Sequence, residues 1–201
     1  MPTSLETSRV KSFVVEQGAA LVGVADMQTL AGIPSVPQRL MEEFPRAVSF
    51  AIRLPDAAID SIVTGPTQAY IDAYQAANSA LDAISSQVVE LFARSGHKAL
   101  PVAASRVVDW QHLRGTVPHQ AVGRVAGLGW QGKSLLIVSP RFGPRLRLST
   151  VLTDMPMEPD GPIPNRCGEC HVCIEACPAG AIKGVATFRP LPHCLRRHGP
   201  R

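Results

Sequence analysis

The chain has 201 residues, of which 45% are hydrophobic and 18% are charged, and its formal net charge is +4. This length predicts one main core with room for a small appended module, and so small a charge does not by itself indicate a nucleic-acid partner. No apolar run is long enough to cross a bilayer, and the N-terminal residues lack the basic start and apolar middle of a signal peptide. We therefore expect a cytoplasmic protein without membrane contact.

Helix and strand signals alternate through the first part of the chain. Thr3 and Glu6 have the spacing of a capping box, and Thr67 is followed by apolar residues at helical spacing. Short apolar runs between turn residues predict buried strands. The predicted elements are a helix over residues 3–17, strands over 20–26 and 46–54, a long helix over 67–95, a strand over 98–104 and a short helix over 119–125.

The segment after this point has the pattern of a β-hairpin. Residues 134–139 and 145–154 are apolar runs separated by the turn RFGP. Residues 157–165, MEPDGPIPN, predict a turn-rich hinge. Helices interspersed with strands predict a mixed α/β, or α+β, sandwich. We divide it into an α/β core over 1–156, which is a possible cofactor-binding domain, and a cluster-binding module over 157–201.

Four of the five cysteines lie in the stretch CGECHVCIEACPAG. Their spacing, C-x2-C-x2-C-x3-C-P, is typical of iron-sulfur proteins and predicts a [4Fe-4S] cluster. Zinc is the main competitor, but zinc sites usually pair two knuckles that a longer stretch separates. The candidate metal ligands are Cys167, Cys170, Cys173 and Cys177, together with the fifth cysteine, Cys194.

The sequence leaves the fourth cluster ligand open. In two-cluster ferredoxins the cysteine before the proline binds the other cluster, and Pro178 favours an extended backbone at Cys177. Three alternatives follow: Cys177 completes the site, Cys194 completes it, or a partner chain supplies the ligand.

Basic residues gather late in the chain, where they are suited to a phosphate or an acidic redox partner, or form an ordinary solvated face. They are Arg141, Arg145, Arg147, Arg189, Arg196, Arg197 and Arg201.

Residues 126–157, AGLGWQGKSLLIVSPRFGPRLRLSTVLTDMPM, and the cysteine run that follows them resemble the epoxyqueuosine reductases and their shorter iron-sulfur relatives. Weaker traces occur at Tyr70, Tyr74 and Asn78. The resemblance implies a nitroreductase-like core that it shares with reductive dehalogenases, and a ferredoxin-like iron-sulfur module. It also implies a base-off cobalamin over the core, which receives electrons from the cluster and reduces an epoxide or a related electrophile.

The resemblance also suggests cofactor-binding residues in AGLGWQGK, namely Gly127, Gly129, Trp130 and Lys133. Glycines let a backbone approach a bulky ligand closely. Without the resemblance, the same pattern is typical of a helix C-cap followed by a tight turn.

Two residues are candidates for proton transfer. Asp109 is the nearest counterpart of the family's catalytic aspartate, although its spacing to Ala126 is longer than the family pattern. His119 stands where shorter relatives tend to carry histidine, and it is a candidate proton donor near neutral pH. A lone aspartate or histidine is also commonly structural.

Full-length members carry a second cysteine motif and C-terminal helical repeats that bind tRNA in some of them. Neither follows here, and Cys194 resembles the cysteine between the two motifs, so we expect one cluster and regard tRNA binding as doubtful. The leading hypothesis is an oxidoreductase that passes electrons from the cluster to a corrinoid or another cofactor, such as a flavin, and receives them from a ferredoxin or flavodoxin. The alternatives are a noncatalytic electron carrier or assembly partner and a structural metal module.

Overall fold

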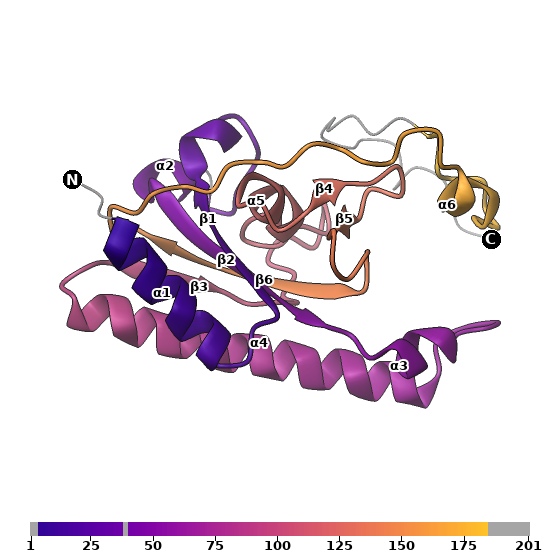
Figure 1. Cartoon of the computed structure of the whole chain (residues 1–201), viewed down its shortest axis with the longest axis horizontal. Helices are drawn as coiled ribbons and strands as arrows, with labels where there is room; N and C mark the ends of the chain where they lie inside the picture. Colours follow the sequence, from indigo (N-terminus) through magenta and orange to yellow (C-terminus); the bar gives the residue numbers. More distant parts are fainter. Residues whose placement is uncertain (1–3, 38–39, 185–201) are drawn as a thin grey trace.

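The computed structural model describes residues 4–37 and 40–184, and its centre is a four-stranded sheet (Figure 1). The strand order is β1-β2-β6-β3, and neighbouring strands run antiparallel. β6 pairs with β2 along its whole length and with β3 over its last four residues. The bounds are Leu21–Asp26 for β1, Arg46–Arg53 for β2, Ala99–Val102 for β3 and Leu146–Thr153 for β6.

Helices cover both faces of this sheet (Figure 1). α1 (Ser4–Glu16) and α4 (Gln68–Arg94) pack on one face. α5 (His119–Val125) packs on the other face beside the 3-10 turn η1 (Met27–Leu30) and the short helix α2 (Leu40–Glu43). The fold is thus a mixed α/β arrangement with an antiparallel sheet, which confirms the coarse prediction from the sequence.

Alternate residues of β2 enter two different hydrophobic cores, because successive side chains of a strand point to opposite faces. Val48 and Phe50 pack in the core under α1 and α4. Ala47 and Ala51 pack in the core under α5 and η1. The sheet is therefore buried on both faces.

α4 begins and ends where the sequence predicted. The side chain of Thr67 accepts a hydrogen bond from the backbone N–H of Tyr70, and Gly96, with a φ of +77°, follows the last turn. Its buried face contains Leu81, Ile84, Val88 and Phe92. No helix in the described part of the chain is both long enough and apolar enough to cross a membrane.

The predicted hairpin between residues 134–139 and 145–154 is wrong. β6 forms, but β5 pairs with β4 in a separate two-stranded sheet. β2 pairs along all of β6 and β3 takes part of its other edge, so β6 is a central strand rather than one arm of a hairpin. The bounds are Trp130–Gln131 for β4 and Ile137–Val138 for β5.

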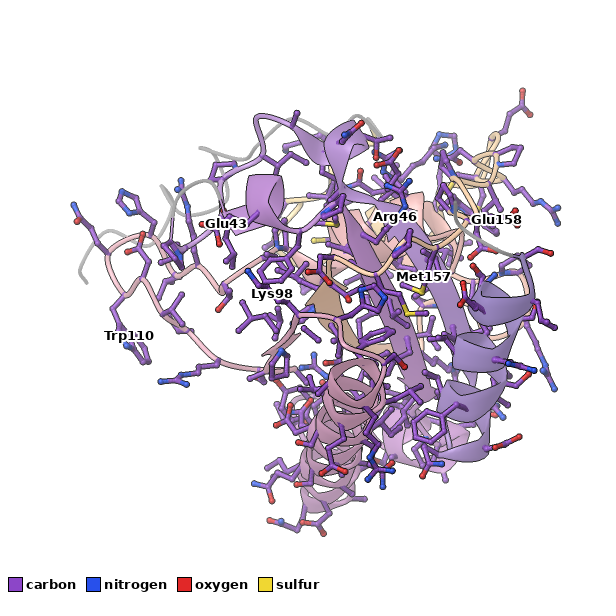
Figure 2. All side chains as sticks on the ribbon, turned by 90° about the vertical axis from the view of Figure 1, so that its left-hand side faces the viewer. Glu43, Arg46, Lys98, Trp110, Met157 and Glu158 are labelled. Carbon is purple, nitrogen blue, oxygen red and sulfur yellow. The ribbon has the colours of Figure 1, made fainter. Side chains whose placement is uncertain are left out.

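The turns predicted for residues 157–165 do not form. Residues 157–165 form an extended segment, called here the strap, which crosses the core towards the cysteine run (Figure 1). Met157 is buried and its carbonyl oxygen accepts a hydrogen bond from Arg46 Nε at 2.8 Å. Figure 2 shows Arg46 and Met157 near one another. Glu158 and Ile163 precede prolines, which favours extended backbone at both positions, and Gly161 is the one residue of this segment with a positive φ, at +77°.

Asp160 joins the strap to β1, which is an edge strand of the sheet. Its backbone N–H donates to the carbonyl oxygen of Val24 at 3.0 Å, and its carboxylate accepts from the N–H of Val24 at 2.7 Å. The same carboxylate pairs with Lys11 of α1. The strap therefore satisfies part of the β1 edge that would otherwise be open.

Candidate functional site

The cysteine run forms an open loop at one end of the molecule, around the short helix α6 (Val172–Glu175) (Figure 1). The N–H of Cys170 donates to the carbonyl oxygen of Cys167 at 2.9 Å, and the N–H of Cys177 donates to Ile174 at 3.3 Å. The four cysteines in this loop are free thiols. Cys194 lies outside the described residues.

Residues 158–184 include no buried side chain, so this part of the chain has no hydrophobic core of its own. Within the described residues, no three His, Cys, Asp or Glu side chains are grouped so that they could hold a metal ion. Each thiolate of a cubane cluster binds a different iron, so such a cluster needs a wider spacing of its ligands than a single ion does.

Backbone amides surround the sulfur of Cys177. The N–H of Ala181 donates to Cys177 Sγ at 3.3 Å. This bond, and then the N–H of Ile182, hold the pKa of the Cys177 thiol below its ordinary value, because they stabilise the thiolate. These donors therefore favour the thiolate form of Cys177.

The β4–β5 hairpin contacts the cysteine loop through Trp130 and Lys133. Trp130 Nε1 donates to Cys167 Sγ at 3.4 Å. Lys133 Nζ donates to the carbonyl oxygens of Gly168 and Cys170 at 2.8 and 2.9 Å. Two of the four predicted cofactor-binding residues thus lie against the cysteine run.

Asn165 adds a further bridge between this hairpin and the loop. Its side-chain amide donates to the carbonyl oxygen of Gln131 at 2.8 Å and accepts from the N–H of Cys167 at 2.8 Å. The last residues of the strap are therefore held on β4 just before the first cysteine.

Gly127 and Gly129 have packing roles. Gly127 has a φ of +75°, and a Cβ there would lie 2.9 Å from the carbonyl oxygen of Gly161 in the strap. A Cβ on Gly129 would lie 2.4 Å from the carbonyl oxygen of Val138 in β5. These contacts account for both glycines without a ligand, and their part in cofactor binding stays a prediction.

A cleft of about 390 Å³ opens beside β6, beyond the end of β3. Leu136 and Ile137 of the β4–β5 hairpin form part of its lining. The same hairpin thus borders the cleft and contacts Cys167. The remaining lining residues are Ala104, Pro118, His119, Gln120, Pro144, Leu146, Arg147 and Leu148.

His119, at the start of α5, lies in this cleft with both ring nitrogens engaged. Nε2 lies 3.1 Å from the carbonyl oxygen of Ala103, and Nδ1 lies 2.9 Å from Thr150 Oγ1. A carbonyl only accepts, so these partners assign the proton to Nε2 and make Nδ1 the acceptor. Burial lowers the pKa of His119, the charge of Arg147 lowers it further, and the bond to Ala103 opposes both. The ring is neutral near pH 7, and its one proton is already donated.

Arg147 forms a polar cluster with α4 at the cleft, and the sequence did not reveal this cluster. Its guanidinium lies 4.2 Å above the centre of the Tyr74 ring. Its Nε donates to Asn78 Oδ1 at 3.0 Å, and the Tyr74 hydroxyl bonds Ser105 Oγ at 2.8 Å. The bond to Ser105, and then the charge of Arg147, lower the pKa of Tyr74. The sequence feature that could have indicated this cluster is the spacing of Tyr74 and Asn78, which lie one helical turn apart.

The other late basic residues do not gather at this cleft. Arg145 pairs with Asp56 and Asp60, the first and last residues of the short helix α3 (Asp56–Asp60). Arg141 is exposed. Arg189, Arg196, Arg197 and Arg201 lie outside the described residues.

Asp109 directly precedes Trp110, an exposed side chain that Figure 2 shows on a loop at the edge of the molecule. Its carboxylate accepts from the N–H of His112 at 3.1 Å and pairs with His112 Nδ1 at 2.8 Å. These bonds to His112 lower the pKa of Asp109. Asp109 is not among the residues that line the cleft, and the structure does not bring the two predicted catalytic residues together.

No protein-family model matches the chain. Over 76 residues it is 38% identical to the epoxyqueuosine reductase of Listeria monocytogenes, a match that covers 38% of this chain and 20% of that protein. The epoxyqueuosine reductase of Vibrio cholerae is 26% identical over 210 aligned positions, which cover 90% of this chain and 56% of that protein. The chain therefore spans about half the length of this relative and less of the other.

Solved structures show the same fold. The epoxyqueuosine reductase of Streptococcus thermophilus superposes with a TM-score of 0.62 at 19% identity, over 90% of this chain and 54% of that one. A second epoxyqueuosine reductase, solved with a modified tRNA stem loop, gives 0.60 at 21% identity, over 89% and 53%. A reductive dehalogenase whose structure suggests a B12-dependent mechanism gives 0.66 at 21% identity, over 86% and 25%.

The chain therefore shares its fold with solved epoxyqueuosine reductases and a reductive dehalogenase. Its sequence is similar to epoxyqueuosine reductases. The resemblance predicted from AGLGWQGK and the cysteine run is confirmed.

Proposed function

We propose that the chain is an iron-sulfur reductase of the epoxyqueuosine reductase type. In this proposal Cys167, Cys170 and Cys173, with Cys177 or Cys194, hold a [4Fe-4S] cluster that passes electrons to a corrinoid or another cofactor at the core. The observation that carries it is the β4–β5 hairpin. One strand of this hairpin contacts Cys167 through Trp130, and the other borders the cleft at Ile137.

The residues of the cysteine loop fit a cluster. The thiols are free, and N–H donors reach the sulfurs of Cys167 and Cys177, as hydrogen bonds commonly do around cluster thiolates. A loop without a hydrophobic core of its own needs another source of folding free energy, and metal binding supplies it in small metal-binding modules. We therefore propose a ferredoxin-like module attached to a nitroreductase-like core.

The boundary between the two units is proposed from the strap. Met157 and Asp160 contact the core, whereas Asn165 contacts the β4–β5 hairpin beside the first cysteine. We propose that residues 157–161 belong structurally with the core, and that the module begins within the remainder of the strap. Closely spaced reduced thiols favour the cytoplasm as its compartment.

The cleft is the proposed site for the second cofactor or for the substrate. When bound, a corrinoid supplies the low-potential centre that removes oxygen from an epoxide. Arg147 offers a positive charge and His119 a neutral, positioned imidazole at this cleft. Asp109 remains a proposed proton donor that requires its loop to fold over the cleft, since its carboxylate is paired with His112 in the present conformation.

The first test is anaerobic reconstitution with analysis of iron, sulfide and zinc, followed by titration with cobalamin. About four iron and four sulfide per chain, with a base-off shift in the cobalamin spectrum, would support the proposal. The same iron content without a shift would remove the corrinoid. Zinc in place of iron would leave a structural metal module.

The second candidate function is a noncatalytic electron carrier. It is favoured by the position of the cysteine loop at the surface, where Cys170 is exposed. A carrier accepts electrons from reduced ferredoxin or flavodoxin and donates them to an added acceptor without cobalamin. Turnover of an epoxide with a chemical reductant and no partner protein would contradict this candidate.

A tRNA stem loop is a further proposed partner. The sequence made tRNA binding doubtful, but a structural neighbour was solved with such a stem loop. Binding of a stem loop to this chain, measured at increasing salt, tests it. Equal affinity for stem loops with and without the modified nucleotide would indicate that the chain contacts only the phosphates of the RNA.

A further inference from the structure

We infer that Trp130 tunes the reduction potential of the cluster, and that Lys133 positions the cysteine loop against it. This inference rests on the proposed cluster at Cys167, Cys170 and Cys173. The sequence suggested that the AGLGWQGK segment binds a second cofactor. The inference adds that two residues of this segment act on the cluster.

The indole of Trp130 reaches the first cysteine directly. Its N–H donates to Cys167 Sγ at 3.4 Å, and the sulfur is the acceptor because an indole nitrogen can only donate. A hydrogen bond withdraws electron density from a ligating sulfur. The reduced cluster, which carries one more negative charge, therefore gains more from this bond than the oxidised cluster does, and the reduction potential rises.

The backbone under Trp130 is held in a fixed position. Trp130 is paired with Val138, and a Cβ on Gly129 or on Gly132 would clash with Val138, at 2.4 and 2.8 Å. The absence of these methyl groups lets β4 lie closely on β5. The indole is therefore supported by a hairpin that borders the cleft with its other strand, rather than by a loop.

Lys133 acts on the backbone of the cysteine loop. Its ammonium group donates to the carbonyl oxygens of Gly168 and Cys170, which flank the first turn of the cysteine run. This fixes the spacing of Cys167 and Cys170 and places a positive charge beside the proposed cluster. A nearby cation also favours the more negative, reduced state.

The experiment compares two single-tryptophan variants, because the chain contains only Trp110 and Trp130. Trp130→Phe removes the donor to the sulfur and keeps an aromatic side chain. Trp110→Phe is the matched control, since Trp110 is 75% exposed on a separate loop. Each reconstituted protein is reduced by dithionite in a mediated titration, in which the cluster takes up one electron, and its EPR signal is followed against potential.

We expect Trp130→Phe to shift the midpoint to a more negative potential and Trp110→Phe to leave it unchanged. Lys133→Gln should shift the midpoint in the same direction and lower the iron content. Equal midpoints in wild type and in Trp130→Phe, at equal iron content, would overturn the inference while leaving the proposed cluster intact.

Fluorescence gives a second reading that does not require turnover. In Trp110→Phe the remaining Trp130 should lose most of its emission when the cluster is assembled, because the iron-sulfur centre lies beside it. In Trp130→Phe the remaining Trp110 should lose much less. Equal losses of emission in the two variants would place Trp130 away from the cluster and overturn the inference. Absence of iron from the reconstituted wild type would overturn the proposed function as well as the inference.

Discussion

The guanidinium of Arg147 lies over the ring of Tyr74, 4.2 Å from its centre. Arg147 comes from β6 and Tyr74 from α4, so the contact joins the central strand to the long helix at the edge of the cleft. A cation over an aromatic face contributes about 0.5–1 kcal/mol at partly exposed sites. The contact also places a positive charge near a phenol whose pKa is already lowered by Ser105.

Replacing Arg147 with Met should raise the pKa of Tyr74 towards its ordinary value, because the charge that favours the tyrosinate is removed. The chain has only two tyrosines, so a Tyr70→Phe background leaves Tyr74 as the one phenol in an absorbance titration. Arg145→Met is the control, since Arg145 pairs with Asp56 and Asp60 instead. An unchanged Tyr74 pKa in Arg147→Met would contradict the stacking arrangement.

His119 should make the protein less stable in acid. Burial lowers its pKa in the folded state, so the unfolded chain binds a proton more readily. The contribution of His119 to stability is complete above the pKa of the unfolded chain, about 6.5, and is lost as the pH falls through the pKa of the folded protein. Each unit of difference between these two pKa values corresponds to about 1.4 kcal/mol. Urea unfolding from pH 8 to pH 5 measures this.

A His119→Gln variant should be less stable at pH 8 but should show a flatter dependence on pH. The matched control is His112→Gln, because His112 is exposed on the Asp109 loop. If both variants keep the slope of the wild type, His119 is not the group responsible.

Asp160→Ala should loosen the strap. The substitution leaves the N–H of Val24 without its side-chain acceptor and removes the partner of Lys11, which should cost about 1–3 kcal/mol. Glu158→Ala is the comparison, because Glu158 binds Thr7 through its backbone N–H. Amide exchange should rise across residues 157–165 in Asp160→Ala alone, and equal exchange in the two variants would show that the Asp160 side chain does not hold the strap.

Single serine substitutions should sort the cluster ligands. Cys167→Ser, Cys170→Ser and Cys173→Ser should each lose the cluster, whereas Cys177→Ser and Cys194→Ser should differ from one another. Iron and sulfide content after anaerobic reconstitution is the measurement. Full retention of iron in both of the last two variants would mean that the fourth ligand comes from outside the chain or that one thiol replaces the other.

The sequence by itself determined the elements whose signals are local. The apolar spacing of α4, the Thr67 cap and Gly96 predicted that helix closely, because capping and amphipathic periodicity depend on neighbouring residues. The cysteine spacing and the AGLGWQGK segment likewise indicated the resemblance to epoxyqueuosine reductases that the comparisons confirm.

Only the tertiary structure decided which segments meet. The sequence of β5 is that of a strand whether it pairs with β6 or with β4. It pairs with β4 because β2 and β3 occupy the two edges of β6. The strap was expected as turns because its prolines and glycine are typical of turns, yet the free edge of β1 holds it extended. Trp130 and Cys167 are 37 positions apart, and Arg147 and Tyr74 are farther, so no local pattern encodes these contacts. Arg147 and Tyr74 meet because α4 packs on β6. Trp130 and Cys167 meet because hydrogen bonds of Lys133 and Asn165 hold the start of the cysteine loop on the β4–β5 hairpin.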